Sequence, residues 1–402
     1  MPTIETLVPS AGEVDAAALR ELSGDELAAY VADPAHPWWR RRPCVVALAG
    51  RVPESRVAAL IARACDPRDE AMVRIALLDL LADRTELLPW LRHEDRRRDR
   101  SYGMPEAIIK ARGVLGDRSA AGGLATLAAS PWPHRRESGE AGLDALVTRY
   151  GVEAVLSELG DTRPEDRAFR VRMRHRAGDD VADALADPDH GVAYLAQSLL
   201  TDPVRLRARL DAAPTTEAKL WTAYALHRLT DDTAETRAIY ASLGRPRVEV
   251  PGLDEELRAA ILHEYASGCE WQSDPRWRVE ALCAEPPARP DKDARLRAAT
   301  TALREAGFHP EPPVSAGADN RQGEGTYHVI RYDGDRVLIS TLGRFAYCDD
   351  DVDPAAHRAL ESAGFRWIDE PVHQILVTGL CVYYFGERKP LGVSTLLFYW
   401  QD

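Results

Sequence analysis

The sequence predicts a mainly α-helical protein, in which a solenoid of paired helices precedes a small α+β module. Three observations favour this fold class. The stretch 66–81 is apolar on nearly every side of a helix, so other helices must bury it. Related segments recur at the spacing of helix pairs. Beyond the proline-rich stretch 286–290 the pattern changes to short strands. We therefore expect a helical-repeat domain over 1–285 and an α+β domain over 286–402.

The helix in 66–81 is expected to open at an Asp-Pro pair, in which Asp66 can cap the first turn and Pro67 fixes φ at the first helical position. Leu77 is expected at its buried centre. Setting Arg41 against Arg74 also aligns an earlier Asp-Pro pair, at 33–34, with this one. A helix over 53–64 lies between the two segments. The result is a repeated helix–turn–helix unit with a period typical of solenoids.

Looser copies of this unit follow. The segment 1–32 is expected to contain one amphipathic helix, 23–32, after a loop, and 92–100 is expected to be a loop. Prolines, glycines and Asp-Pro pairs delimit the remaining helices, which continue to about residue 284: 105–116, 120–129, 133–150, 152–159, 164–177, 180–186, 190–200, 204–210, 216–229, 234–243 and 253–266.

The pattern of 66–81 is an Asp-Pro pair, then an apolar residue and an arginine, then Ala and Leu at helical spacing. It resembles HEAT-like repeats, including the short type of the phycobilisome lyases. The segment 217–229 is similar, with Lys219 in the place of Arg74. The resemblance covers roughly 33–284. It implies an all-α solenoid with a binding role, because that family has no shared catalytic residues.

The last part of the chain contains an internal repeat, since the segment 302–314 aligns with the segment 359–372. Each copy is expected to be a helix ended by a glycine and followed by a pair of strands. The order αββαββ then gives one four-stranded antiparallel sheet with two helices on one face. The strand pairs are 326–332 with 336–342, around an Asp-Gly turn, and 374–385 with 393–400.

Both faces of the last two expected strands are apolar, whereas a half-solvated antiparallel sheet alternates apolar and polar residues. The second face must therefore be covered. The two candidates are the end of the solenoid and another copy of the chain, so self-association through this sheet stays an alternative.

Composition argues against several functions. The formal charge of −13, with a pI near 5.4, disfavours general binding to nucleic acids or anionic membranes. No apolar run reaches the roughly 18 residues of a spanning helix, and no secretion signal opens the sequence. The six cysteines form no Cys-x-x-Cys pair and mostly lie in apolar runs, as expected of reduced core residues in a cytoplasmic protein.

No motif predicts catalysis, a cofactor or a metal. His263 and Glu264 resemble the start of a zinc-protease helix, but Ser267 stands where the second histidine is required. The aspartates of 349–353 lack the glycine and glutamate of a calcium loop. They instead favour the N-terminus of the helix that Pro354 opens.

Arginines supply the candidate binding residues, in places beside aromatic side chains. If 164–177 is helical, four of them form a single ridge. The complete set is Arg163, Arg167, Arg170, Arg174, Arg96, Arg97, Trp39 and Arg41. One interpretation is a surface for a DNA backbone, as in the HEAT-like alkylpurine DNA glycosylases. A second interpretation is an ordinary solvated helix face. Nearby carboxylates and the net negative charge of the chain favour it.

The architecture therefore favours a non-enzymatic binding or scaffold protein whose solenoid surface binds a protein partner. A DNA-backbone binder is the alternative, and an enzyme with an unrecognised site ranks third.

Overall fold

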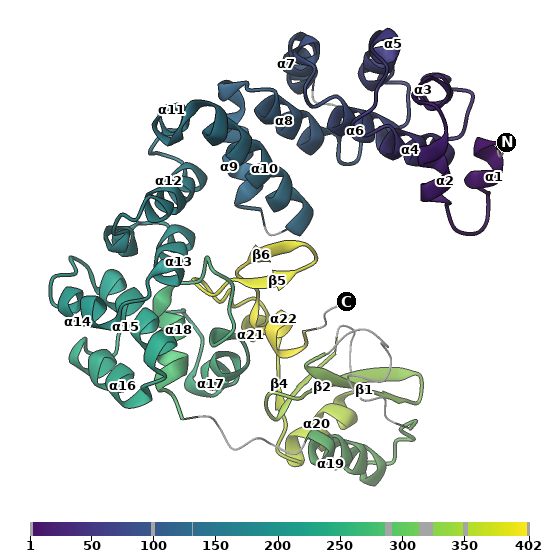
Figure 1. The fold of residues 1–402 in the computed structure, drawn as a ribbon. Coiled ribbons are helices and arrows are strands. Elements are labelled where there is room, and N and C mark those ends of the chain that lie inside the picture. Colours follow the sequence, from purple (N-terminus) through teal and green to yellow (C-terminus); the bar gives the residue numbers. More distant parts are fainter. Residues whose placement is uncertain are drawn as a thin grey trace. The chain divides into compact units, whose positions relative to one another are not determined.

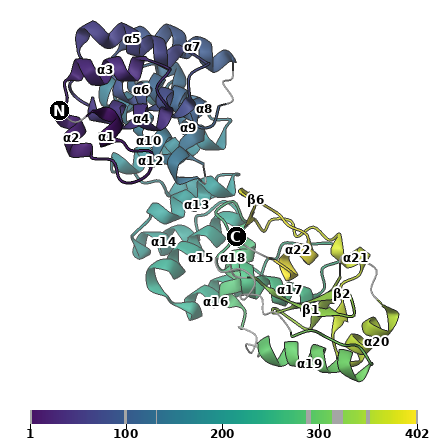
Figure 2. The ribbon, with the colours of Figure 1, turned by 90° about the vertical axis from the view of Figure 1, so that its right-hand side faces the viewer.

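The computed structural model describes residues 3–97, 101–130, 132–285, 292–312, 325–348 and 353–399, with only the backbone described for 94–97 and 292. The described chain is mainly helical and carries a small four-stranded mixed sheet (Figures 1 and 2). It divides into two compact units, 1–173 and 174–402.

Helices make up the first unit. Short 3₁₀ helices at Thr85–Leu87 and Arg118–Ala120 join some of them. The α-helices are α1 (Ile4–Leu7), α2 (Ala16–Glu21), α3 (Gly24–Ala32), α4 (Trp38–Ala47), α5 (Glu54–Cys65), α6 (Ala71–Leu80), α7 (Leu88–Arg97), α8 (Met104–Val114), α9 (Ala121–Ala128), α10 (Pro133–Tyr150), α11 (Val152–Leu156) and α12 (Pro164–Arg176), whose last residues belong to the second unit.

The helices of the first unit pack in pairs. Helix α3 packs against α4, α5 against α6, α7 against α8, and α9 against α10. The second members also form a row, in which α4 contacts α6, α6 contacts α8, and α8 contacts α10. In Figure 1, α3, α5 and α7 lie along one side of the row formed by α4, α6 and α8. Each helix therefore buries one face against its partner and another against the neighbouring pair.

Helix α6 lies in the core of the first unit, as its sequence predicts. Val73, Leu77 and Leu78 are buried there, and Leu77 has no exposed surface. Helices α4, α5 and α8 pack around α6. A helix that others surround in this way is apolar on nearly every side.

Three expectations for the first unit are wrong. The Asp-Pro pair at 66–67 does not open the helix, because α6 begins at Ala71 with Glu70 at its N-cap. The segment 1–32 contains α1 and α2 besides α3, and 92–97 belongs to α7 instead of a loop. Leu87 and Leu91 are buried and Leu88 packs against the same core. These apolar positions at helical spacing anchor α7, although the run of charged residues after them suggests a loop.

The second unit contains the remaining described helices and the described strands. A 3₁₀ helix (Ala182–Ala186) precedes them and a π-helical turn (Leu262–Ala266) extends α17. The elements are α13 (His190–Leu199), α14 (Pro203–Leu210), α15 (Thr216–Thr230), α16 (Thr233–Ser242), α17 (Glu255–Ile261), α18 (Pro275–Cys283), α19 (Lys292–Glu305), β1 (Tyr327–Tyr332), β2 (Asp335–Ser340), β3 (Phe345–Tyr347), α20 (Pro354–Ser362), β4 (Arg366–Trp367), α21 (Glu370–His373), β5 (Val382–Tyr384), β6 (Glu387–Lys389) and α22 (Val393–Leu397).

The predicted antiparallel sheet is correct for its first hairpin and wrong beyond it. Strands β1 and β2 pair antiparallel, and β3 pairs antiparallel with β2. Strand β4 pairs parallel with β3, so the sheet is mixed, with order β1-β2-β3-β4. Strands β5 and β6 form a separate hairpin, and 393–397 is helix α22. This last run is apolar on all sides, so its periodicity does not distinguish a strand from a buried helix.

Helices α19 and α20 pack with β1, β2 and β3 around one core, as expected (Figures 1 and 2). Apolar residues of 377–399 pack instead against residues of 248–277 in a second core. Tyr265 donates a hydrogen bond of 2.6 Å to the Leu396 carbonyl within this core. Much of the apolar surface that needed a cover is therefore buried inside the chain, although Leu376 and Phe385 stay exposed, and self-association through this surface remains an alternative. The linker 286–290 lies outside the described residues, so the boundary at 285 stays a prediction.

Candidate binding surface

Helix α12 carries the predicted arginine ridge, but the neighbouring backbone engages its arginines. Arg163, just before the helix, donates from Nη2 to the Gly122 carbonyl of α9 at 3.0 Å. Arg167 donates from Nη1 to the carbonyls of Asp161 and Thr162 at 3.0 Å each. These bonds fix the loop that leads into α12.

The other two ridge arginines are engaged in the same way. Arg170 donates from Nη2 to the Leu159 carbonyl at 3.3 Å. Arg174 donates to the Asp180 carbonyl at 2.9 Å and lies 3.7 Å from the carboxylate of Asp183. The ridge therefore holds the loops at both ends of α12, which leaves less of its charge available to a ligand.

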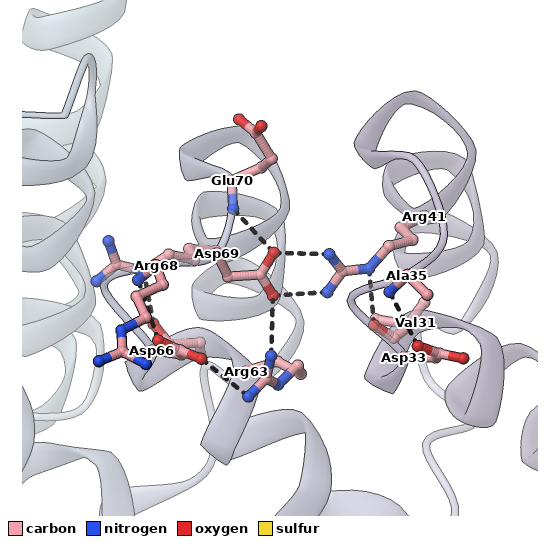
Figure 3. A network of polar contacts seen from close by, with 11 residues as sticks. Val31, Asp33, Ala35, Arg41, Arg63, Asp66, Arg68, Asp69 and Glu70 are labelled. Atoms are coloured by element: carbon pink, nitrogen blue, oxygen red, sulfur yellow. Dashed lines mark hydrogen bonds and ion pairs between the residues drawn. The ribbon is translucent and has the colours of Figure 1, made fainter.

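Arg41 also acts inside the protein (Figure 3). Its guanidinium donates two bonds of 2.6 Å to the carboxylate of Asp69, and its Nε donates to the Val31 carbonyl at 2.9 Å. The Arg41 and Asp69 side chains are only 1% and 2% exposed. Arg63 lies 3.9 Å from the same carboxylate and 3.0 Å from that of Asp66, which extends the network toward the surface.

A bond from an arginine to the carbonyl ten residues earlier recurs along the chain. Arg74 of α6 donates from Nε to the Ala64 carbonyl near the end of α5 at 3.1 Å. Arg41 of α4 makes the equivalent bond to Val31 near the end of α3. The last carbonyls of a helix have no partner within it, so these arginines satisfy them and join the two helices of a pair. Arg41 and Arg74, which align with each other in the sequence, thus make equivalent contacts in the structure.

The remaining predicted residues lie on other helices. Trp39 of α4 is half-buried against the first core, with the Arg40 guanidinium 4.5 Å from its ring centroid. The backbone of Arg96 and Arg97 belongs to α7, and their side chains lie outside the described residues. The described members of the predicted set are thus engaged within the protein.

Two adjoining cavities in the second unit form a different candidate, which we call the Arg209 groove. Their volumes are about 260 and 230 Å³. The 3₁₀ helix Ala182–Ala186 and helix α14 contribute to both, and α15 contributes to the second. Both contact Arg209 and Ala182. The first has charged residues along its wall, and the second is lined mainly by small apolar residues, among them Leu185, Ala186, Ala212, Ala213, Pro214 and Ala218.

Charged groups in the Arg209 groove are held in ion pairs. Arg209 donates to Asp180 at 2.7 Å and to Asp183 at 3.1 Å. The Ala182 amide and the Arg209 guanidinium lower the pKa of Asp180 against an opposing effect of burial. That carboxylate therefore stays charged at neutral pH. A group of this kind suits recognition better than proton transfer, which needs a pKa near the working pH.

The sequence does not single out the Arg209 groove. Asp180 and Asp183 lie at a 3₁₀ turn that the sequence presents as an ordinary helix, and Arg209 comes from the next helix pair. Only the packing of α14 brings Arg209 next to Asp180 and Asp183, so no spacing in the sequence identifies the three residues as one site.

Among the described residues, no three His, Cys, Asp or Glu side chains are grouped to hold a metal ion, and no helix is long and apolar enough to cross a bilayer. No protein-family model, curated protein or solved structure matches the chain.

Proposed function

We propose that the chain is a non-enzymatic binding protein, built as a HEAT-like α-solenoid, which binds a protein partner through its helical surface. The paired packing of α3 to α10 supports the solenoid interpretation. The arginine–carbonyl bonds of Arg41 and Arg74, at equivalent places in successive pairs, support a true repeat.

The main support for a protein partner is the Arg209 groove. Its two cavities, of about 260 and 230 Å³, are each smaller than the roughly 300–1,000 Å³ of small-molecule sites. Each has room for one or two side chains of a partner. The apolar cavity would accept an aliphatic or aromatic side chain, and the ion-paired carboxylates beside it would orient polar groups of the partner.

The alternative function, binding to a DNA backbone, has weaker support. Phosphate affinity comes from positive charge that the protein does not itself neutralise. The ridge residues Arg163, Arg170 and Arg174 bind carbonyls and lie within 4.0 Å of carboxylates of the same chain. The formal charge of −13 acts in the same direction.

A substitution at the mouth of the apolar cavity tests the protein-binding proposal. Ala212 is exposed, so Ala212→Arg should fill the cavity without disturbing the fold. Ala241→Arg, at an exposed alanine of α16, is the matched control. We expect the wild type and the control to capture the same partner from a lysate of the native host, identified by mass spectrometry, and Ala212→Arg to lose it. Equal capture by all three proteins would exclude the Arg209 groove.

A gel-shift assay tests the alternative. We expect no binding to random duplex DNA at low salt. A shift at about 50 mM salt that disappears by about 200 mM would favour the DNA-binding function instead, because phosphate contacts weaken steeply with salt.

A further inference from the structure

The two cavities of the Arg209 groove adjoin but have different walls. Arg209 and Ala182 contact both of them. Asp179, Asp180 and Asp202 contribute to the wall of the first cavity, whereas small apolar side chains line most of the second. A partner segment that fills the apolar cavity therefore brings a neighbouring side chain to the charged one.

Negative charge is in excess on one wall of the charged cavity. Arg209 donates to Asp180 at 2.7 Å and to Asp183, which lines the apolar cavity, at 3.1 Å. Arg174 lies 3.7 Å from Asp183 and 4.0 Å from Asp179. Within the described part of the chain, three carboxylates thus share two guanidinium groups, so one negative charge on this wall is left without compensation.

The other wall of this cavity is closer to neutral. Asp202 lies 3.4 Å from Arg205, so these two charges compensate each other. Leu200 caps the C-terminus of α13, and its carbonyl accepts a hydrogen bond of 2.6 Å from Arg228. The charge of Arg228 therefore faces the negative end of the α13 dipole, which offsets part of it. The wall formed by 179–183 thus supplies the excess negative charge.

We propose that the partner segment in the Arg209 groove carries a lysine or arginine side chain beside an aliphatic or aromatic one. This inference rests on the proposed function. The basic side chain would occupy the cavity of about 260 Å³ and pair with Asp179, which is 59% exposed and has Arg174 only at 4.0 Å. The apolar side chain would fill the cavity of about 230 Å³. An acidic side chain would be repelled by the same carboxylates, so the groove also discriminates among partners.

Saturation-transfer difference NMR of the full chain tests this chemistry with two synthetic probes, N-acetyl-leucyl-lysyl-leucine amide and N-acetyl-leucyl-glutamyl-leucine amide. The probes have the same apolar side chains and differ in the sign of the central charge. At neutral pH and low salt we expect the lysyl peptide to bind, with signals from its leucine methyl groups and from the methylene beside the ammonium group. The glutamyl peptide should bind at least about threefold more weakly, because its charge is repelled.

Asp179→Lys is the decisive variant, because Asp179 is exposed and its replacement should leave the fold intact. We expect its affinity for the lysyl peptide to fall about threefold to tenfold, since an attractive exposed charge becomes a repulsive one. Glu249→Lys, at an exposed carboxylate that contributes to neither cavity, changes the net charge equally and should retain wild-type affinity. A basic partner segment would be refuted by an absence of lysyl-peptide binding to the wild type, by equal binding of the two peptides, or by wild-type affinity in Asp179→Lys.

The capture experiment with Ala212→Arg decides the proposed function separately. If Ala212→Arg loses the partner while Asp179→Lys captures as much of it as the wild type, the Arg209 groove binds a protein that presents no basic side chain there. The proposed function then stands and the present inference fails. If Ala212→Arg retains the partner, the groove is not the binding surface, whichever peptide binds.

Discussion

Arg41 and Asp69 connect two successive helix pairs of the first unit through a buried ion pair with two hydrogen bonds of 2.6 Å. A buried pair of this kind adds little over an apolar pair, but the loss of one partner leaves a charge without compensation. At the scale of single residues, this is the contact most sensitive to substitution in the network of Figure 3.

We predict that Asp69→Ala lowers the free energy of unfolding by about 3–5 kcal/mol, because it leaves the buried Arg41 charge unpaired. Urea denaturation monitored by circular dichroism measures this change. Asp25→Ala removes an exposed ion pair with Arg56 and should cost at most about 1 kcal/mol. A similar small loss for both variants would show that the Arg41–Asp69 pair is not critical.

The same pair gives a pH dependence. Burial alone would raise the pKa of Asp69, but hydrogen bonds from Arg41 and from the Glu70 amide outweigh it and lower the pKa. A carboxyl whose pKa is lower in the folded state contributes its full stability above the unfolded-state value of about 3.9. This contribution is lost as the pH falls through the folded-state pKa.

We therefore predict that the stability difference between the wild type and Asp69→Asn is largest above about pH 4 and shrinks in more acid solution. Urea titrations at a series of pH values provide the measurement. A difference that stays constant down to about pH 2 would contradict the assignment of the lowered pKa to Asp69.

At the scale of elements, close approach between α9 and α10 depends on glycine. A Cβ atom at Gly139 of α10 would lie 2.3 Å from the backbone nitrogen of Ala128 and 2.6 Å from the Leu124 carbonyl oxygen. Backbone atoms cannot rotate away as a flexible side chain would, so any side chain at this position must separate the two helices.

We predict that Gly139→Ala lowers the free energy of unfolding by about 1–3 kcal/mol, although alanine favours helix formation. Thermal unfolding measures the loss. Gly268→Ala is the control, since a Cβ atom there meets nothing within 4 Å, and it should change stability by less than about 0.5 kcal/mol. Stabilisation by Gly139→Ala would show that α9 and α10 are not in close contact.

At the scale of the whole molecule, one core of the second unit joins the C-terminal segment to the helices before it. Residues of 377–399 pack against residues of 248–277, and the Trp277 indole donates to the Thr378 carbonyl at 3.1 Å. The C-terminal module thus depends on the helices before it.

We predict that the isolated fragment 290–402 is poorly soluble, because removal of 248–277 exposes the apolar surface of 377–399. The fragment 1–178 contains its own cores and should fold as a helical body. Size-exclusion chromatography and thermal unfolding of both fragments provide the measurement. A soluble, monomeric 290–402 fragment with a cooperative transition would show that this module is independent.

The sequence alone determined those features that depend on neighbours along the chain. Helix α10 runs over Pro133–Tyr150 as predicted, and the Asp-Gly turn forms the β1–β2 hairpin. Leu77 is buried because the run around it is apolar on nearly every side. In each case a proline, a turn dipeptide or the apolar period acts within a few residues.

Tertiary structure decided the features that depend on distant residues. The run 393–397 is a helix because a core surrounds it, and β4 lies parallel to β3 because the chain returns through α20. Arg41 finds Asp69 on the next helix pair, so its charge is neutralised in the interior and unavailable to a ligand. The sequence shows which side chains carry charge, but the packing of helices determines which charges meet, because side chains far apart in the chain become neighbours only on folding.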